Sequence, residues 1–255
     1  LNNKENHNCI FELLLASKIC GENSEYLEEG EAYAHKVVSK FQGRCDHLAS
    51  IAHYLIGVSL SAQSKKVCSD SQKISRQSEA IEALETAQRL TDDTNPNVLY
   101  YLSLENAEQR KLGAALYYAK KVLKIEAGSG LKGWILLARI LSAQKRYGDA
   151  ESIINAALDE TGKWDQGELL RTKAKLQIAQ GRLKDAIATY THLLAVLQVQ
   201  KKSFGVHKKL LRVCASQFTT YICFKMISFL VRAHDVSEEG LNIFLKFLFG
   251  TFLGK

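Results

Sequence analysis

Proline is almost absent from this sequence: among 255 residues, Pro96 is the single example. Because proline removes a backbone N–H and clashes with the preceding turn, its scarcity lets long helices run unbroken. Hydrophobic residues make up 46% of the chain, which is enough for a packed core and too many for a disordered protein. The composition therefore favours an all-α fold.

Cysteine pairs and catalytic motifs are missing as well. The six cysteines have irregular spacings and form no C-x-x-C pair, which is typical of reduced thiols in the cytoplasm. Cys45 and His47 are close in sequence, but a zinc site needs four ligands and no second pair follows. There is no glycine-rich phosphate loop, H-E-x-x-H or G-x-S-x-G motif. The sequence predicts a protein without enzymatic activity, metal or cofactor.

A dense block of one charge is also lacking. The 34 Lys and Arg residues exceed the 27 Asp and Glu residues, which gives a net charge of +7. This excess is scattered and is not interleaved with aromatic residues in the repeat region, so we do not expect nucleic-acid binding. An acidic protein face or an anionic lipid surface remains compatible with the charge.

What the sequence does contain is a repeat with a period of about 34 residues, the signature of stacked helix pairs. Its clearest unit spans 131–166, and large and small apolar residues in it recur at helical spacing. The first helix carries Trp134, Leu137, Ala138 and Leu141, and the second carries Tyr147, Ala150, Ile154 and Ala157. This spacing reproduces the pattern of the tetratricopeptide repeat, in which alanines let two antiparallel helices approach closely.

The same template predicts units at 96–130 and 167–200, the first beginning at an Asn95 cap followed by Pro96. Two weaker units are predicted at 8–43 and 46–93. In the first of them, Leu15 and Ile19 are expected to face the core, and in the second a polar insertion at 65–77 is expected to form a surface loop. The array as a whole covers 8–205. The predicted architecture is a right-handed solenoid of antiparallel helix pairs with an atypical C-terminal helical tail.

The stretch from Asn95 to Gly205, which includes LSAQKR and AALDETGKW, resembles the plant No Pollen Germination proteins and, more distantly, the tetratricopeptide repeat protein 7 group. The resemblance extends more loosely back to Asn8. It implies calmodulin binding and a scaffold that helps place a phosphatidylinositol 4-kinase complex at the plasma membrane. The implied location is cytoplasmic, with peripheral association at that membrane.

Residues 206–255 depart from the family pattern, which a translated intron or an alternative end would explain. The apolar stretch from Val213 to Val231 is interrupted by Gln217 and Lys225 and does not favour a spanning helix. Leu241 to Leu253 is short, so it could lie on a membrane, cap the last repeat or aggregate.

Partner sites can be placed by helical periodicity. Five residues of first helices are expected to point into a concave groove that suits an acidic peptide, although they could also be solvated charges on exposed faces. They are Tyr100, Lys132, Arg139, Arg171 and Lys175.

Two stretches have the basic amphipathic character of calmodulin targets. The stretch from Arg110 to Ile125 is better interpreted as the second helix of a repeat. The stretch from Lys208 to Arg232 lies in the divergent tail. Its candidate contacts are Lys208, Lys209, Leu211, Arg212, Phe218 and Phe224.

Overall fold

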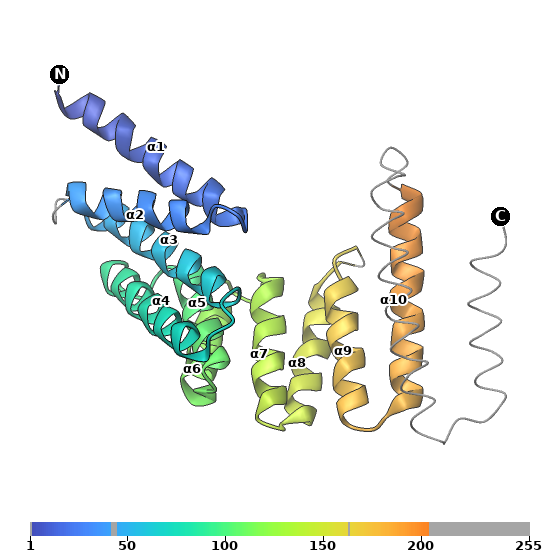
Figure 1. Ribbon diagram of the computed structural model, residues 1–255. Helices are drawn as coiled ribbons and strands as arrows, with labels where there is room; N and C mark the ends of the chain where they lie inside the picture. Colours follow the sequence, from blue (N-terminus) through green and yellow to red (C-terminus); the bar gives the residue numbers. More distant parts are fainter. Residues whose placement is uncertain (1, 42–44, 163, 204–255) are drawn as a thin grey trace. The chain divides into compact units, whose positions relative to one another are not determined.

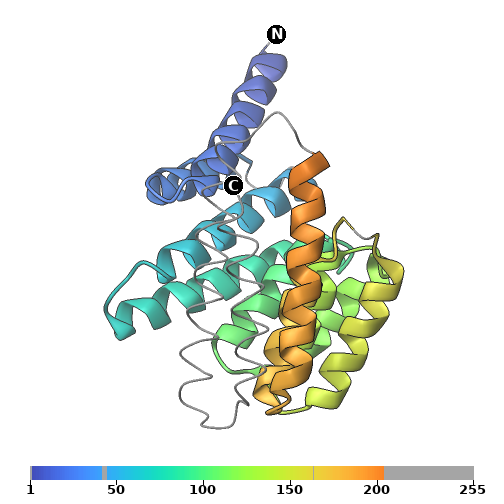
Figure 2. The same ribbon diagram turned by 90° about the vertical axis from the view of Figure 1, so that its right-hand side faces the viewer.

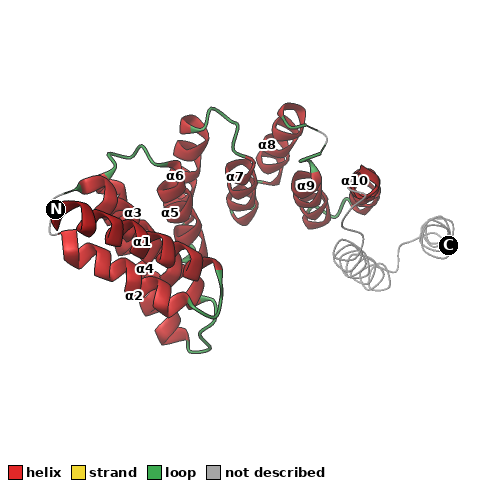
Figure 3. Ribbon diagram, turned by 90° about the horizontal axis from the view of Figure 1, so that it is seen from above, coloured by secondary structure: helices red, strands yellow, loops and turns green. Residues whose placement is uncertain are grey.

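The computed structural model describes residues 2–41, 45–162 and 164–203, and all regular structure in these ranges is α-helical (Figures 1 and 3). The ten helices are α1 (Asn2–Glu22), α2 (Leu27–Phe41), α3 (Asp46–Ser64), α4 (Asp70–Leu90), α5 (Pro96–Glu108), α6 (Leu112–Ile125), α7 (Leu131–Ala143), α8 (Tyr147–Glu160), α9 (Gly167–Ala179) and α10 (Leu183–Ser203). The all-α prediction is confirmed. The C-terminal tail 206–255 lies outside the described residues.

The chain divides into two compact units, residues 1–196 and 197–255, and the helix pairs described below belong to the first. Consecutive helices pack against each other from α1 to α9, and α7 to α10 run alternately up and down in Figure 1. First helices also touch one another, in the order α1, α3, α5, α7 and α9. The hydroxyl of Thr189 on α10 donates to Gln177 on α9 at 2.8 Å, and Figure 2 shows α10 in front. These contacts are those of stacked antiparallel helix pairs.

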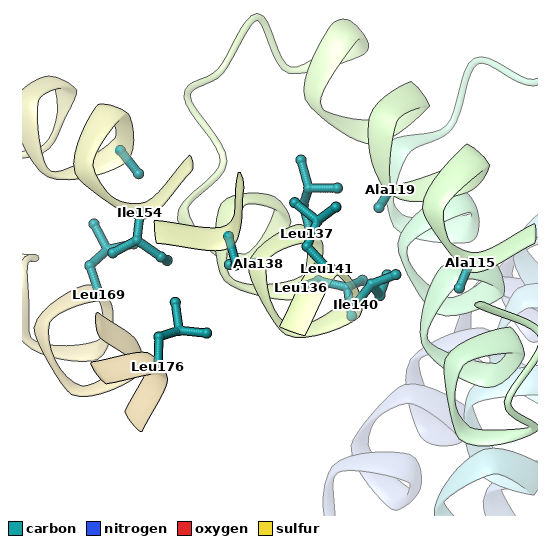
Figure 4. Close-up of a cluster of buried hydrophobic side chains, with 12 residues drawn as sticks. Ala115, Ala119, Leu136, Leu137, Ala138, Ile140, Leu141, Ile154, Leu169 and Leu176 are labelled. Atoms are coloured by element: carbon teal, nitrogen blue, oxygen red, sulfur yellow. The ribbon is translucent and has the colours of Figure 1, made fainter. Parts of the chain in front are cut away.

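Small buried residues allow this close packing. In Figure 4, Ala115 and Ala119 of α6 lie on one side of the leucines of α7, and Ile154, Leu169 and Leu176 lie on the other. Both alanines and Ile154 are almost fully buried. Because a helix pair exposes apolar surface that only the next pair covers, this cluster continues through three successive pairs.

The start of α5 follows the local rules that its sequence contains. The Asn95 side chain accepts a hydrogen bond from the Asn97 backbone N–H at 3.0 Å, and Pro96 occupies the first helical position. Proline loses nothing there, since the first N–H groups of a helix have no partner within it. This cap fixes where the α5 and α6 pair begins.

The prediction of a loop over 65–77 is wrong for most of its length, because α4 begins at Asp70. Residues 70–75 are helical and exposed, and Ser75 donates to Glu79 within the same helix at 2.7 Å. The polar composition therefore belongs to the solvated first turns of a long helix. Only 65–69 connect α3 to α4.

The prediction of which side of the first helix faces the core is also wrong. Leu15 and Ile19 are each 58% exposed, whereas Ile10 and Leu14 are buried in the core that α1 shares with α2 and α3. Both sets satisfy an apolar helical period, so the sequence alone left two faces to choose between. Packing of α1 against α2 and α3 selects the face with Ile10 and Leu14.

Candidate partner-binding face

The first helices carry a continuous set of side chains that the core packing covers only in part. On each helix two of these residues lie one turn apart, at equivalent positions of the repeat, and each is half-buried or exposed. Since α3, α5, α7 and α9 touch in series, the pairs adjoin one another. This set, called the first-helix face below, consists of Tyr54 and Val58 on α3, Tyr100 and Leu104 on α5, Ile135 and Arg139 on α7, and Arg171 and Lys175 on α9.

The five predicted groove residues fall on α5, α7 and α9. Lys132, Arg139 and Lys175 are exposed, while Tyr100 and Arg171 are half-buried. Arg171 Nη1 lies 3.2 Å from Glu168 Oε1, one turn earlier on the same helix, so part of its charge is balanced locally. Lys132 and Arg139 are two turns apart on α7 and point to the same side of it. They are the simplest cationic pair for a partner to reach.

Sequence reasoning placed Tyr100 on this face but missed its aromatic neighbours Tyr54 and Tyr101. The rings of Tyr54 and Tyr101 meet edge to face with centroids 5.7 Å apart, and Tyr100 meets Tyr101 in the same way at 5.6 Å. The contact between Tyr54 and Tyr101 joins α3 to α5. Tyr54 precedes Tyr100 by more than one repeat length, because the α3 and α4 pair is longer than the other pairs. A 34-residue spacing therefore does not align the two tyrosines.

The pKa values of Tyr54 and Tyr100 reflect an apolar environment at the first ring and a partly cationic one at the second. Burial raises the pKa of Tyr54 to about 12, and the neighbouring Tyr101 adds to this effect. Burial also raises the pKa of Tyr100, but the Arg139 guanidinium opposes the shift. Arg139 is therefore close enough to Tyr100 to favour a negative charge there. An acidic ligand that also carries an aromatic or aliphatic group would match this junction.

A buried carboxyl group lies on the same helix as Tyr101. Ser61 Oγ of α3 donates a hydrogen bond to Glu105 Oε1, while Oε2 has no hydrogen-bond partner among the described residues. Burial raises the pKa of Glu105 and Lys65 partly offsets the shift. Glu105 has no exposed surface, so it is part of the packing between α3 and α5 and cannot touch a ligand.

The candidate calmodulin stretch from Arg110 to Ile125 forms α6. Val122 is buried, and Leu116 and Leu123 pack against the cluster between α6 and α7. The exposed side carries Lys120 and Lys124. A calmodulin groove needs the apolar side, which the stack already covers. The second candidate, Lys208 to Arg232 with Phe218 and Phe224, lies outside the described residues.

Metal and membrane sites receive no support within the described ranges. Cys45 is half-buried and His47 is exposed, and no group of three or more potential metal ligands comes together among the described residues. None of the helices in these ranges has both the length and the apolar character needed to cross a membrane.

Comparison with known proteins identifies the family of this chain. It is 55% identical over 207 residues to Protein NPGR2 of Arabidopsis thaliana, which covers 81% of this chain and 28% of that protein. It is 43% identical over 205 residues to Protein NPG1 of the same plant, with 80% and 29% covered. The chain belongs to the NPG family. It spans less than a third of the length of these curated relatives.

Membership in the NPG family agrees with more distant likenesses. Human tetratricopeptide repeat protein 7B is 32% identical over 183 residues, which is 72% of this chain and 21% of that protein. No family model matches the chain.

Solved tetratricopeptide-like repeats of a Podospora anserina kinesin light chain share its fold with a TM-score of 0.62 at 14% identity, covering 77% of this chain and 97% of that one. YrrB, a tetratricopeptide protein with an unusual peptide-binding site, gives 0.51 at 14% identity, with 80% and 90% covered. The fold is a tetratricopeptide solenoid, and this fold supports a protein-interaction scaffold.

Proposed function

We propose that this chain is a non-catalytic scaffold that holds protein partners on its first-helix face. The observation that carries the proposal is the adjoining series of half-buried and exposed side chains on α3, α5, α7 and α9. Helix pairs of this kind use the surface of their first helices for binding. The scaffold role agrees with the fold and with the relatives.

The finer proposal is that the partners are those the NPG resemblance implies. They are the protein subunits of a phosphatidylinositol 4-kinase complex, which the scaffold would help to place at the plasma membrane, and calmodulin. A cytoplasmic location with peripheral membrane association follows from this proposal. The high identity to NPGR2 over most of the chain supports it.

The second candidate is a general adaptor that binds an acidic peptide. Exposed Lys132 and Arg139 favour it, because guanidinium and ammonium groups form charge-assisted hydrogen bonds with carboxylates. Tyr100 and Ile135 next to them supply apolar surface for a neighbouring side chain of the peptide. A third candidate, anchoring by 206–255, concerns residues outside the described part.

Charge reversal on α7 tests the use of this face. The double variant Lys132→Glu/Arg139→Glu in the full chain should lose at least about tenfold in capture of the kinase subunits from plant cells, since like charges at an interface cost several kcal/mol. Capture of an immobilised glutamate-rich peptide should be measured in parallel. Loss of both supports the shared face, and loss of peptide capture alone favours the general adaptor.

The matched control is Lys120→Glu/Lys124→Glu, which makes the same change of net charge on the exposed side of α6. Its capture of the kinase subunits should equal that of the unaltered chain. If the α7 variant also captures both partners normally, the first-helix face is not the binding surface.

A further inference from the structure

The turns within successive helix pairs repeat the same backbone and the same charge. They read Gln-Arg-Lys at 109–111, Gln-Lys-Arg at 144–146 and Gln-Gly-Arg at 180–182. In each, the third residue donates its N–H to a carbonyl five positions earlier at 2.9 Å, and the second donates to one three positions earlier. The bonds that span five positions run from the N–H groups of Lys111, Arg146 and Arg182 to the carbonyls of Asn106, Leu141 and Gln177. The bonds that span three positions run from the N–H groups of Arg110, Lys145 and Gly181 to the carbonyls of Ala107, Ser142 and Ile178. The cationic residues are therefore geometrically equivalent.

Two of these cations occupy a backbone conformation that disfavours them. Arg110 and Lys145 both have φ of 62°, in the left-handed region where Gly181 has 75°. Glycine is the usual residue at this helix-ending position because a Cβ is unfavourable there. A long cationic side chain at Arg110 and Lys145 therefore opposes local stability, and both side chains are exposed.

Because successive helices are antiparallel, the turns within pairs lie at one edge of the stack and the loops between pairs lie at the other. Figure 1 shows the α7–α8 and α9–α10 turns at the lower end and the α8–α9 loop at the upper end. The charges that are scattered in sequence thus collect in space. The turn edge, as defined here, consists of Lys65, Lys66, Arg110, Lys111, Lys145, Arg146, Arg182 and Lys184.

The loops between pairs carry Asp92, Asp93, Glu126 and Asp165, and Glu160 is the last residue of α8. Asp93 is paired with Lys121 at 2.7 Å. On the turn edge itself, Arg146 is paired with Asp149 at 2.6 Å, and Arg182 is paired with Glu151 and with Asp185. Of the described residues, no carboxylate lies within ion-pair distance of Arg110, Lys111 or Lys145. The series begins at the α3–α4 turn, since the α1–α2 turn carries Glu22 and Glu25.

We propose that the turn edge binds the surface of an anionic phospholipid bilayer. None of the exposed large apolar side chains of the described residues belongs to these turns. A protein interface has an apolar core, whereas cations near a bilayer gain affinity from the headgroup charges alone. The acidic loops at the opposite edge would be repelled, which orients the helix pairs edge-on to the membrane. The turn edge shares no residue with the first-helix face, so this proposal stands apart from the scaffold function.

The test is binding of the full chain to vesicles of phosphatidylcholine containing about one third phosphatidylserine. The double variant Arg110→Gly/Lys145→Gly should bind roughly twenty-five-fold more weakly, at about five-fold per cation removed. The same variant should melt at a higher temperature, because glycine suits both backbone positions. Loss of binding together with a gain in stability excludes misfolding as the cause. Residues beyond 203 are unaltered, so they contribute equally to every measurement.

Lys120→Ala/Lys124→Ala removes the same charge from the exposed side of α6 and should bind vesicles as the unaltered chain does. Pure phosphatidylcholine should bind neither, and binding should weaken as salt is raised. Equal binding of the glycine variant and the unaltered chain would overturn the proposal. The proposal would also be overturned if the chain bound a polyglutamate resin through Arg110 and Lys145 but did not bind vesicles. That result would indicate that the turn edge binds an acidic protein.

Discussion

Glu105 shows how one side chain can make the stability of the helix stack depend on pH. Its pKa is raised by burial above the ordinary value of 4.5. The folded chain therefore holds this proton more tightly than the unfolded chain does. The associated stability is fully present below the unfolded pKa and is lost as the pH rises through the folded pKa.

Glu105→Gln keeps an acceptor for Ser61 and removes the titrating charge, so its stability relative to the unaltered chain should increase as the pH is raised. Its free energy of unfolding should vary less between pH 4.5 and 8 than that of the unaltered chain. Urea unfolding across that range measures both effects. Glu82→Gln, on the exposed side of α4, is the control and should leave the profile unchanged. If the free energy of unfolding of Glu105→Gln depended on pH in the same way as that of the unaltered chain, the Glu105 carboxyl would not be the titrating group.

Two glycines separate packing from helix propensity. A Cβ added to Gly57 would lie 2.6 Å from Leu84 Cγ, whereas one added to Gly113 would meet no heavy atom within 4 Å. Gly57→Ala should cost about 2 kcal/mol from overpacking, although alanine is the better helix former. Gly113→Ala should gain about 0.5 kcal/mol. The melting temperatures of the two variants should thus shift in opposite directions. If both rose, the Leu84 side chain would be able to move and accommodate the added methyl group.

At the scale of the element, α6 has the composition of a calmodulin target and the packing of a core helix. Its apolar side contacts α5 and α7, and Lys120 and Lys124 lie on its exposed side. Binding through α6 would require local unfolding. Of the two candidate stretches, the one from Lys208 to Arg232 is therefore the stretch that the proposed calmodulin binding would use.

Phe218→Ala/Phe224→Ala should reduce capture by calcium-loaded calmodulin by at least about tenfold, since large apolar anchors provide most of such binding energy. Lys120→Glu/Lys124→Glu in α6 should leave capture unchanged. Chelation of calcium tests whether the binding depends on it. Loss of capture by the α6 variant alone would place the site in the repeat.

The elements that were predictable from sequence are those whose boundaries have a local cause. The start of α5 was recognised because Asn95 and Pro96 encode a cap. The start of α4 was not, because its first turns contact nothing that would require apolar residues. The inward phase of α1 was missed for a related reason, since Leu15 and Leu14 both continue an apolar period and only tertiary contacts distinguish them.

At the scale of the whole molecule, the repeat period predicted the fold, and the resemblance at Asn95 to Gly205 predicted the family. The positions of Lys132 and Arg139 on one side of α7 followed from helical spacing. The tyrosine cluster did not, because Tyr54 and Tyr101 meet only after α3 and α5 pack together. The basic turn edge was also invisible, since its members are separated by whole repeats and are brought together by the antiparallel order of the helices.

Each described helix contacts only helices of its own pair and of the adjoining pairs, and this has a consequence for evolution. Among the described residues, α9 packs on α7 and α8 and not on α3 or α4, so these helix pairs share no single centre whose geometry every later change must respect. Whole hairpins can be gained or lost in a lineage while the remaining ones keep their interiors. Length is therefore the property that such a protein can alter most freely, and the surface it offers grows in proportion.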